Sequence, residues 1–182
     1  MRFMETTLTD ARLIELDKRG DARGFFARVF CEAEFAAAGL ETRFVQANHS
    51  RSAQRGTLRG MHFQRAPHRE TKVVRVVRGA LLDVIIDLRA DSPSYGRWEA
   101  FELTAENGRM LYVPAGFAHG FQTLADDTEV TYQVSTAYAP DSEGGVRWDD
   151  PAFGIDWPLP VSVISDKDAA WPDVDLAAGV RI

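Results

Sequence analysis

The sequence predicts a mainly β protein with the architecture of a jelly-roll β-barrel and a few short helices. Short apolar or alternating runs recur along the chain, many of them rich in Val, Ile, Phe and Tyr, which are the residues that favour strands. Turn-forming segments separate these runs, and only one segment has the pattern of a clear helix. Many short strands at regular spacing with few helices are typical of such barrels, in which inward-facing and outward-facing side chains alternate around a pocket.

The predicted strands each end at a turn that contains Gly, Pro, Asp or Asn. In chain order the strands cover residues 13–16, 43–46, 57–63, 72–77, 81–88, 98–103, 110–113, 120–124 and 129–135. Residues 31–38 form the predicted helix, because Gly39 follows at the position just past a helix end, where glycine is favoured. After Pro158 the pattern allows a short helix before an acidic tail.

Length and composition place the chain among ordinary globular proteins. Its 182 residues fit one domain, residues 1–182, and its 45% hydrophobic and 26% charged residues exclude a disordered or fibrous class. The apolar runs are far shorter than the roughly 20 residues of a membrane span, and the N-terminus has charges where an export signal would be apolar. The single cysteine, Cys31, excludes an internal disulfide. It fits a reducing compartment, so we expect a cytoplasmic protein.

The charge of the chain is unevenly distributed. The net charge is −6, yet nine positive side chains and only one acid, Glu70, lie between Arg43 and Arg78. A basic segment in an acidic protein predicts a local anion site, although a solvated basic face is the common alternative. Binding to duplex nucleic acid is not expected, because the acidic surface would repel phosphates.

Three polar side chains lie on apolar faces of predicted strands. Tyr132 shares its face with two valines, His119 with two phenylalanines and Lys72 with two valines. A tyrosine or histidine in such a place is usually a hydrogen-bonded core residue, but a buried lysine is costly and more often functional. The three together predict a polar pocket inside the barrel.

The densest polar stretch on a predicted strand is Arg59-Gly60-Met61-His62-Phe63-Gln64. Strict alternation would put Arg59 and His62 on opposite faces of the strand. A bulge at Gly60 would turn both toward one cavity. Otherwise His62 faces solvent or caps a hydrogen bond.

A metal site is the main alternative. His62, His68, Glu70 and His119 are possible ligands, but the close pair of histidines that a mononuclear site usually has is missing, and Lys72 in the same space would repel a cation. Cys31 has no nearby histidine and is not expected to be a nucleophile. No phosphate-binding glycine motif is present.

Ordered segments along nearly the whole chain resemble one family. They are DARGFF (21–26), FVQANHS (44–50), LRGMHFQ (58–64), KVVRVVRG (72–79), DVIIDLR (83–89), PAGFAHGF (114–121), GVRWDDP (145–151) and SDKD (165–168). This set is similar to the dTDP-4-dehydrorhamnose 3,5-epimerases, which are cupin-like nucleotide-sugar epimerases that need no metal. The resemblance implies a cupin-like jelly roll without cofactor, and an isomerase that inverts C3, C5 or both in a nucleotide-linked 4-keto-6-deoxy hexose. The implied substrate is dTDP-4-dehydro-6-deoxyglucose and the implied product dTDP-4-dehydrorhamnose.

The resemblance also implies roles for individual residues. His62 corresponds to the general base, Asp168 to the carboxylate that orients it, Tyr132 to the acid on the other face of the sugar, and Lys72 to the cation beside the C4 oxygen. Further residues correspond to positions that line the sugar site or hold the nucleotide diphosphate: Arg23, Phe26, Gln46, Asn48, Arg51, Arg59, His119, Tyr138 and Lys167. In the family some of these come from a partner subunit through exchanged N-terminal strands, which implies a homodimer.

Epimerisation next to a keto group needs the types of residue that the sequence has at these positions. A keto group at C4 acidifies the C–H bonds at C3 and C5, and the enolate formed on proton removal needs a positive group at its oxygen. A histidine has a suitable strength as a base near neutral pH, and a carboxylate on its other nitrogen fixes the tautomer. Arginine donors suit a diphosphate.

Three positions depart from the family pattern. Arg28 stands where a glutamate is usual near the nucleotide, Ala47 where an acid is frequent, and Gln133 where a lysine is frequent. All three are expected near the substrate site. They leave open the nucleotide base, the sugar and epimerisation at C3 only. A metal-dependent cupin dioxygenase or isomerase and a non-catalytic sugar-nucleotide binder remain as other classes.

Overall fold

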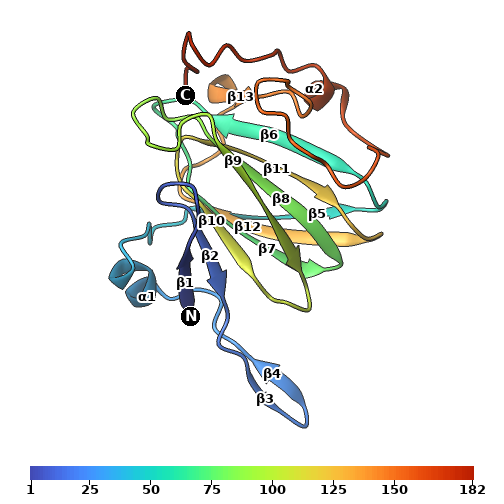
Figure 1. Cartoon of the computed structure of the whole chain (residues 1–182). Coiled ribbons are helices and arrows are strands. Elements are labelled where there is room, and N and C mark those ends of the chain that lie inside the picture. Colours follow the sequence, from blue (N-terminus) through green and yellow to red (C-terminus); the bar gives the residue numbers. More distant parts are fainter.

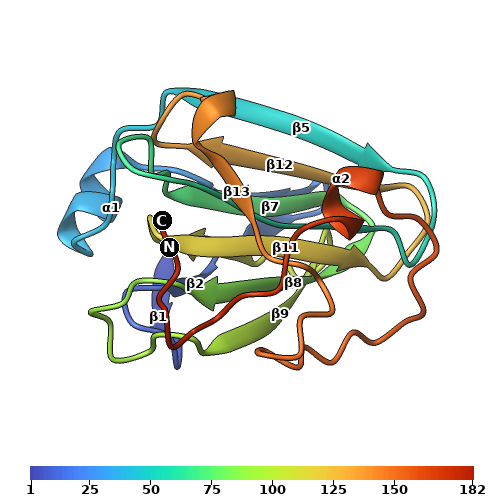
Figure 2. The same cartoon turned by 90° about the horizontal axis from the view of Figure 1, so that it is seen from above.

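Two antiparallel sheets face each other in the computed structural model, which describes all residues 1–182 (Figures 1 and 2). One sheet has six strands in the order β1-β2-β10-β7-β12-β5, and the other has five in the order β13-β6-β11-β8-β9. The strands are β1 (Arg2–Glu5), β2 (Arg12–Glu15), β3 (Arg19–Asp21), β4 (Gly24–Phe26), β5 (Gln46–Ser52), β6 (Leu58–Gln64), β7 (Lys72–Arg78), β8 (Ala80–Asp87), β9 (Trp98–Thr104), β10 (Met110–Val113), β11 (Phe117–Thr123), β12 (Thr128–Val134) and β13 (Glu143–Gly145). The helices are α1 (Glu32–Ala37), α2 (Asp166–Ala169) and the 3₁₀ turn η1 (Pro140–Ser142). The mainly β prediction is therefore confirmed.

Most predicted elements are present, with bounds shifted by up to three residues. The helix prediction is confirmed by α1, which ends before Gly39 at φ +70°, and α2 is the short helix after Pro158. The strand predicted at residues 43–46 is wrong, because the chain becomes a strand only at Gln46. That strand, β5, has the polar sequence QANHSRS and is held in the sheet by its pairing with β12. Its pairing outweighs its low intrinsic preference for strand.

The core lies mainly between the two sheets. Val74, Ile85, Leu111, Phe117 and Val130 belong to one buried cluster there. Burial of this apolar surface is the main stabilising term of such a fold. The sheets therefore form a fixed frame for the polar side chains on the same inner faces.

Two further clusters cover outer faces. The C-terminal segment packs Val146, Phe153 and Ile182 against the outer side of the five-stranded sheet, where Val84 and Ile86 face them. At the N-terminal end, Phe35 of α1 packs with Ile14, Val73 and Met110 on the six-stranded sheet. Neither α-helix is long enough to cross a membrane.

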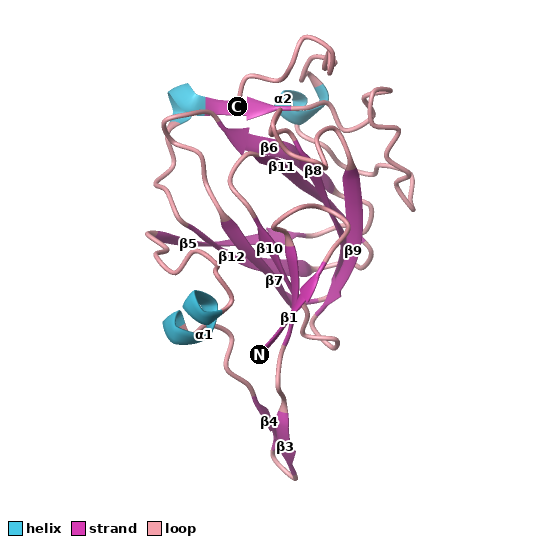
Figure 3. Ribbon diagram, turned by 60° about the vertical axis from the view of Figure 1, so that its left-hand side comes forward, coloured by secondary structure: helices cyan, strands magenta, loops and turns pink.

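The β3–β4 hairpin projects away from both sheets (Figures 1 and 3). Its tip turns at Ala22 and Arg23, and Phe25 and Phe26 are 55% and 71% exposed. Two exposed phenylalanines on a protruding hairpin form an apolar surface whose exposure to water is unfavourable. Within this chain the Lys18 ammonium lies 4.9 Å from the Phe25 ring, and both phenylalanines stay largely exposed.

Candidate active site

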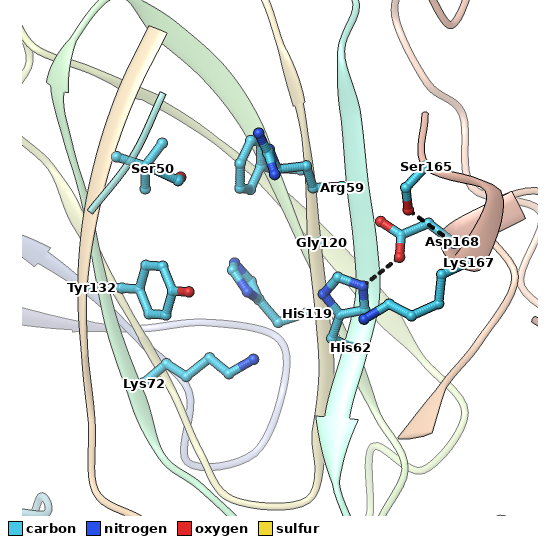
Figure 4. Close-up of a pocket in the computed structure, with 12 residues that line it drawn as sticks. Ser50, Arg59, His62, Lys72, His119, Gly120, Tyr132, Ser165, Lys167 and Asp168 are labelled. Atoms are coloured by element: carbon cyan, nitrogen blue, oxygen red, sulfur yellow. Dashed lines mark hydrogen bonds and ion pairs between the residues drawn. The ribbon is translucent and has the colours of Figure 1, made fainter. Parts of the chain in front are cut away.

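A cavity opens between the inner faces of the two sheets, beside α2 (Figure 4). Strands β5, β7 and β12 form one wall, β6 and β11 form the other, and α2 lies at the edge. The lining residues are Ser50, Arg59, His62, Lys72, His119, Gly120, Phe121, Val130, Tyr132, Ser165, Lys167 and Asp168. Polar and ionisable side chains here take the place of the apolar residues that fill the rest of the interior.

His62 and Asp168, which are 106 residues apart in the sequence, are in direct contact. His62 Nε2 lies 2.7 Å from Asp168 Oδ1, and the backbone N–H of Gly60 donates to the other carboxylate oxygen at 3.0 Å. Ser165 caps α2 by accepting a hydrogen bond from the Asp168 N–H, which fixes the helix turn that carries the carboxylate. The second ring nitrogen of His62 points into the cavity (Figure 4).

The environment of Asp168 keeps it ionised. Burial raises the pKa of this carboxyl, but the hydrogen bond and charge of His62 and the Gly60 N–H more than offset this, so the pKa lies below its usual value. An ionised carboxylate only accepts hydrogen bonds, so the proton on His62 sits on Nε2. In the neutral ring, the cavity-facing nitrogen then carries a lone pair and can accept a proton.

Of the two alternatives for Arg59 and His62, the structure shows the bulge at Gly60. His119 pairs with His62 and Phe121 pairs with Arg59, so three steps along β6 match two steps along β11. The extra residue lets both Arg59 and His62 line the cavity. Gly60 has φ +125°, and a Cβ there would come within 2.5 Å of Gly120 Cα, so only glycine fits.

Tyr132 and Lys72 face His62 from the opposite wall (Figure 4). Burial raises the pKa of the Tyr132 phenol, the negative charge of Glu70 raises it further, and Arg59 acts in the opposite sense. The phenol is therefore fully protonated at neutral pH. Lys72 is buried, and its ammonium lies 3.1 Å from Glu70 Oε1.

A second histidine–aspartate pair lies beside the first. His119 Nε2 is 2.5 Å from Asp83 Oδ1, and Asp83 is fully buried on β8 with its other oxygen unpaired. Sequence reasoning missed Asp83. An acid within the apolar strand LLDVIID was the available signal, because buried carboxylates nearly always have a partner.

A second cavity adjoins the first and shares His62, Lys72 and Tyr132 with it. Its other lining residues are Gln46, Asn48, Phe63, Gln64, Glu70, Val134, Tyr138 and Glu143. The volumes are about 230 Å³ for the first and 290 Å³ for the second. Small-molecule sites typically measure about 300–1,000 Å³, so an extended ligand would need both.

Apart from Arg51 and the residues already placed in the first cavity, the sequence-predicted residues divide into three sets. Gln46, Asn48 and Tyr138 line the second cavity, and Lys167 lines the first. Arg23 and Phe26 lie on the exposed hairpin instead. Ser50, Glu143 and Ser165 line the cavities and were not predicted as site residues, although Ser50 and Ser165 lie in segments that carry the family resemblance. Glu70 also lines a cavity and was considered only as a possible metal ligand.

Arg51 is not in either cavity. It lies on the face of β5 opposite to Asn48 and Ser50, and its guanidinium pairs with Asp127. Among the nine cations of the basic segment, only Arg59 and Lys72 line the cavities. The predicted anion site is therefore much smaller than the segment.

The three departures from the family pattern lie outside both cavities of this chain, contrary to expectation. Ala47 and Gln133 share a shallow pocket with Val29 and Arg75 on the outer face of the six-stranded sheet. Arg28 pairs with Glu34 at 2.7 Å. Strand alternation accounts for Ala47 and Gln133, because their neighbours Asn48 and Tyr132 face inward.

The alternative metal set does not assemble. His68 bonds to Ser142, and Glu70 is paired with Lys72. No group of three or more His, Cys, Asp or Glu side chains is arranged to hold a metal ion. The His62–Asp168 and His119–Asp83 contacts are pairs, which suits proton transfer and orientation of the rings.

Comparison with known proteins agrees with the family resemblance seen in the sequence. The sequence model of the family described as dTDP-4-dehydrorhamnose 3,5-epimerase matches residues 5–175. An enzyme of that name from Sinorhizobium fredii is 47% identical over 175 residues, covering 96% of this chain and 90% of its own.

Solved structures agree closely in fold. The dTDP-4-dehydrorhamnose 3,5-epimerase of Bacillus anthracis, with TDP and PPi bound, has a TM-score of 0.92 and 44% identity over 95% of this chain and 99% of its own. The Legionella pneumophila enzyme in complex with dTDP-4-keto-L-rhamnose has a TM-score of 0.90 and 37% identity over 100% and 98%. A 3'-monoepimerase from Streptomyces bikiniensis, in complex with dTDP-quinovose, has a TM-score of 0.85 and 36% identity over 92% and 85%. With a cupin-like fold, a histidine–aspartate pair facing a tyrosine, and relatives matched over nearly the whole chain, this protein belongs to the dTDP-4-dehydrorhamnose 3,5-epimerase family.

Proposed function

We propose that this protein is an isomerase that converts dTDP-4-dehydro-6-deoxyglucose into dTDP-4-dehydrorhamnose by inverting C3 and C5. Family membership supports the substrate class and the reaction. The single observation that carries the mechanism is the position of His62, with its Asp168 partner, across one cavity from Tyr132 and Lys72. A ring held between them would have a base on one side and an acid on the other.

His62 is the proposed base. Its cavity-facing nitrogen takes the proton from carbon next to the C4 carbonyl, while Asp168 holds the other nitrogen and stabilises the imidazolium that forms. Three hydrogen bonds pre-orient the pair: the Gly60 N–H and the His62 ring donate to the Asp168 carboxylate, and the Asp168 N–H donates to Ser165 Oγ. Little reorganisation is then needed at the moment of transfer.

Lys72 is the proposed partner of the C4 oxygen. Proton removal leaves negative charge on that oxygen, and a buried ammonium stabilises it far more strongly than one in water. Arg59 and His119 line the same cavity and add donors around the sugar.

Tyr132 is the proposed acid. Its protonated phenol points into the cavity from the wall opposite to His62. Proton return from that side gives the inverted carbon, whereas return from His62 regenerates the substrate.

The second cavity suits the nucleotide diphosphate. Gln46 and Asn48 offer amide groups from β5, and the exposed ring of Tyr138 offers a stacking face for the base. Lys167, at the edge of the first cavity, supplies positive charge.

We also propose a cytoplasmic homodimer in which residues 1–182 act as one catalytic domain. The exposed Phe25 and Phe26 on the projecting hairpin support this arrangement, because a partner would cover them. In the dimer, Arg23 and Phe26 would reach the partner's second cavity. Arg51 faces outward and would lie toward the same interface.

The function is tested by proton NMR of dTDP-4-dehydro-6-deoxyglucose with enzyme in deuterated buffer. The expected result is loss of the C3 and C5 proton signals as deuterium enters, with appearance of the rhamno-configured product. Full retention of both proton signals at high enzyme concentration would reject the proposal.

Epimerisation at C3 alone is the second candidate. The similarity to the 3'-monoepimerase, at 36% identity, supports this second candidate function. The same spectrum separates the two, because a C3 epimerase leaves the C5 proton in place.

A further inference from the structure

Glu70 is an acid in a cavity proposed to bind an anion, and the mechanism above does not use it. It lies two residues before Lys72 and lines the second cavity together with Lys72 and Tyr132. Its Oε1 is 3.1 Å from the Lys72 ammonium, and the two side chains are only 13% and 9% exposed. A pair so sheltered from water is screened far less than a surface salt bridge.

Gln64 holds Glu70 from the other side. Its buried amide nitrogen donates to Glu70 Oε2 at 3.2 Å and to the His68 carbonyl at 3.1 Å. Its amide oxygen accepts from the Ala139 N–H at 2.6 Å. Glu70 is thus fixed at both oxygens, by the ammonium of β7 and by an amide that also anchors the segment carrying Tyr138.

The charge of Glu70 is unfavourable for substrate binding taken alone. A carboxylate repels a diphosphate and cancels part of the field that Lys72 offers to an enolate. Lysine, however, is a point charge on a flexible four-carbon stem, and it gives no fixed direction unless a partner holds it. A fixed carboxylate supplies that direction.

We propose that Glu70 is a positioning residue for the epimerisation: its carboxylate fixes the Lys72 ammonium toward the C4 oxygen and places a negative charge beside the Tyr132 phenol. This inference rests on the proposed function for its effect on rate. Its effect on Tyr132 can be measured without any substrate.

The carboxylate of Glu70 shifts the pKa of Tyr132 in a definite direction. Burial raises the pKa of the phenol most, Glu70 raises it further and Arg59 lowers it. The other ionisable groups that line the two cavities around Lys72 are Arg59, His62, His119, Tyr138, Glu143, Lys167 and Asp168. Removal of Glu70 takes away the negative charge that acts on the phenol, so the pKa of Tyr132 falls.

Three variants separate position from charge. Glu70→Gln keeps an oxygen that can accept from Lys72 but removes the charge, and Glu70→Ala removes both. Glu129→Gln is the matched control, because Glu129 lies on the same strand as Tyr132 but pairs with His49 and Arg78 outside the cavities. Two measurements are made on each: the deuterium exchange rate at saturating substrate, and the titration of Tyr132 in substrate-free protein by NMR of ¹³Cζ-labelled tyrosine, with Tyr132→Phe as the assignment control.

The expected results differ between the variants. Glu70→Ala lowers the exchange rate about tenfold or more, since a misplaced catalytic group loses rate steeply, and Glu70→Gln stays within about threefold of wild type. In both, the Tyr132 midpoint moves down by roughly half a pH unit or more, as expected for loss of one charge in a half-buried site. Glu129→Gln changes neither.

A wild-type exchange rate in Glu70→Ala, or an unmoved Tyr132 midpoint in Glu70→Gln, overturns the assignment of Glu70. Absence of exchange in the wild-type protein instead rejects the proposed function, and the titration then still decides whether Glu70 acts on Tyr132.

Discussion

Two histidines on neighbouring strands differ in how they are held. His62 and His119 are register partners across β6 and β11, and each contacts an aspartate. The partner of His119 is on the adjacent strand β8, fully buried, whereas the partner of His62 comes from α2 near the C-terminus. The side chain of His62 is 32% exposed and that of His119 10%. The more open ring, with its nitrogen free in the cavity, is the better placed to exchange protons with a substrate.

The depressed pKa of Asp168 predicts a pH dependence of stability. Because the folded-state pKa lies below the unfolded value of about 3.9, the His62–Asp168 pair contributes stability above that pH, and the contribution is lost as pH falls through the folded pKa. We expect wild type to lose more stability than Asp168→Asn when the free energy of unfolding is measured by urea denaturation from pH 6 down toward pH 3. Parallel curves for the two proteins would contradict this assignment.

The residues of the site were partly predictable because strand alternation is local. Lys72, His119 and Tyr132 could be assigned to inner faces from their neighbours alone, and the structure places all three in one cavity. The contact between His62 and Asp168 could not be predicted from local pattern, since nothing local relates a strand residue to a helix more than 100 positions later. Only the family resemblance joined them.

At the scale of elements, strand β6 depends on one glycine. Gly60 allows the bulge that turns Arg59 and His62 to the same side, and β11 passes so close that Gly120 is also required to be small. Short alternating strands such as β7 and β12 were predictable from apolar periodicity. The polar β5 and the short β13 were not predictable, because they are held by strands distant in the sequence, β12 and β6. The hairpin strands β3 and β4 pair only with each other and have three residues each, too few for a periodic pattern.

Gly60→Ala tests the role of the bulge. The new Cβ would meet β11 backbone at 2.5 Å with φ at +125°, so we expect a large fall in thermal stability and loss of exchange activity in the folded fraction. Gly154→Ala is the control, because Gly154 has φ +57° and open space around it. That substitution should cost only about 1–2 kcal/mol of backbone strain. Melting temperature and exchange rate are measured on both, and an active Gly60→Ala protein would show that the bulge is dispensable.

At the scale of the whole molecule, the proposed dimer predicts that the β3–β4 hairpin serves the partner's cavity. Arg23 and Phe26 are too exposed to stabilise their own chain, since the Arg23 side chain is 89% and Phe26 is 71% exposed. If the hairpin serves the partner, a chain lacking His62 can lend its hairpin to a chain whose own hairpin is defective. The heterodimer then holds one complete site.

Co-expression of His62→Ala with the double variant Arg23→Ala, Phe26→Ala tests this. Each homodimer should be nearly inactive, and the random mixture should recover roughly a quarter of the wild-type exchange rate, as pairing statistics in a two-fold dimer require. A mixture no more active than its parents would mean that each hairpin acts on its own chain or not at all.

The most direct test of the central claim is deuterium incorporation by the single variants His62→Ala and Tyr132→Phe, each compared with wild type on the same ketosugar. With an imidazole removing the proton on one side and a phenol returning it on the other, His62→Ala should incorporate no deuterium, whereas Tyr132→Phe should still incorporate deuterium but form little inverted product. Undiminished incorporation in His62→Ala, or unimpaired inversion in Tyr132→Phe, would contradict the two-sided mechanism.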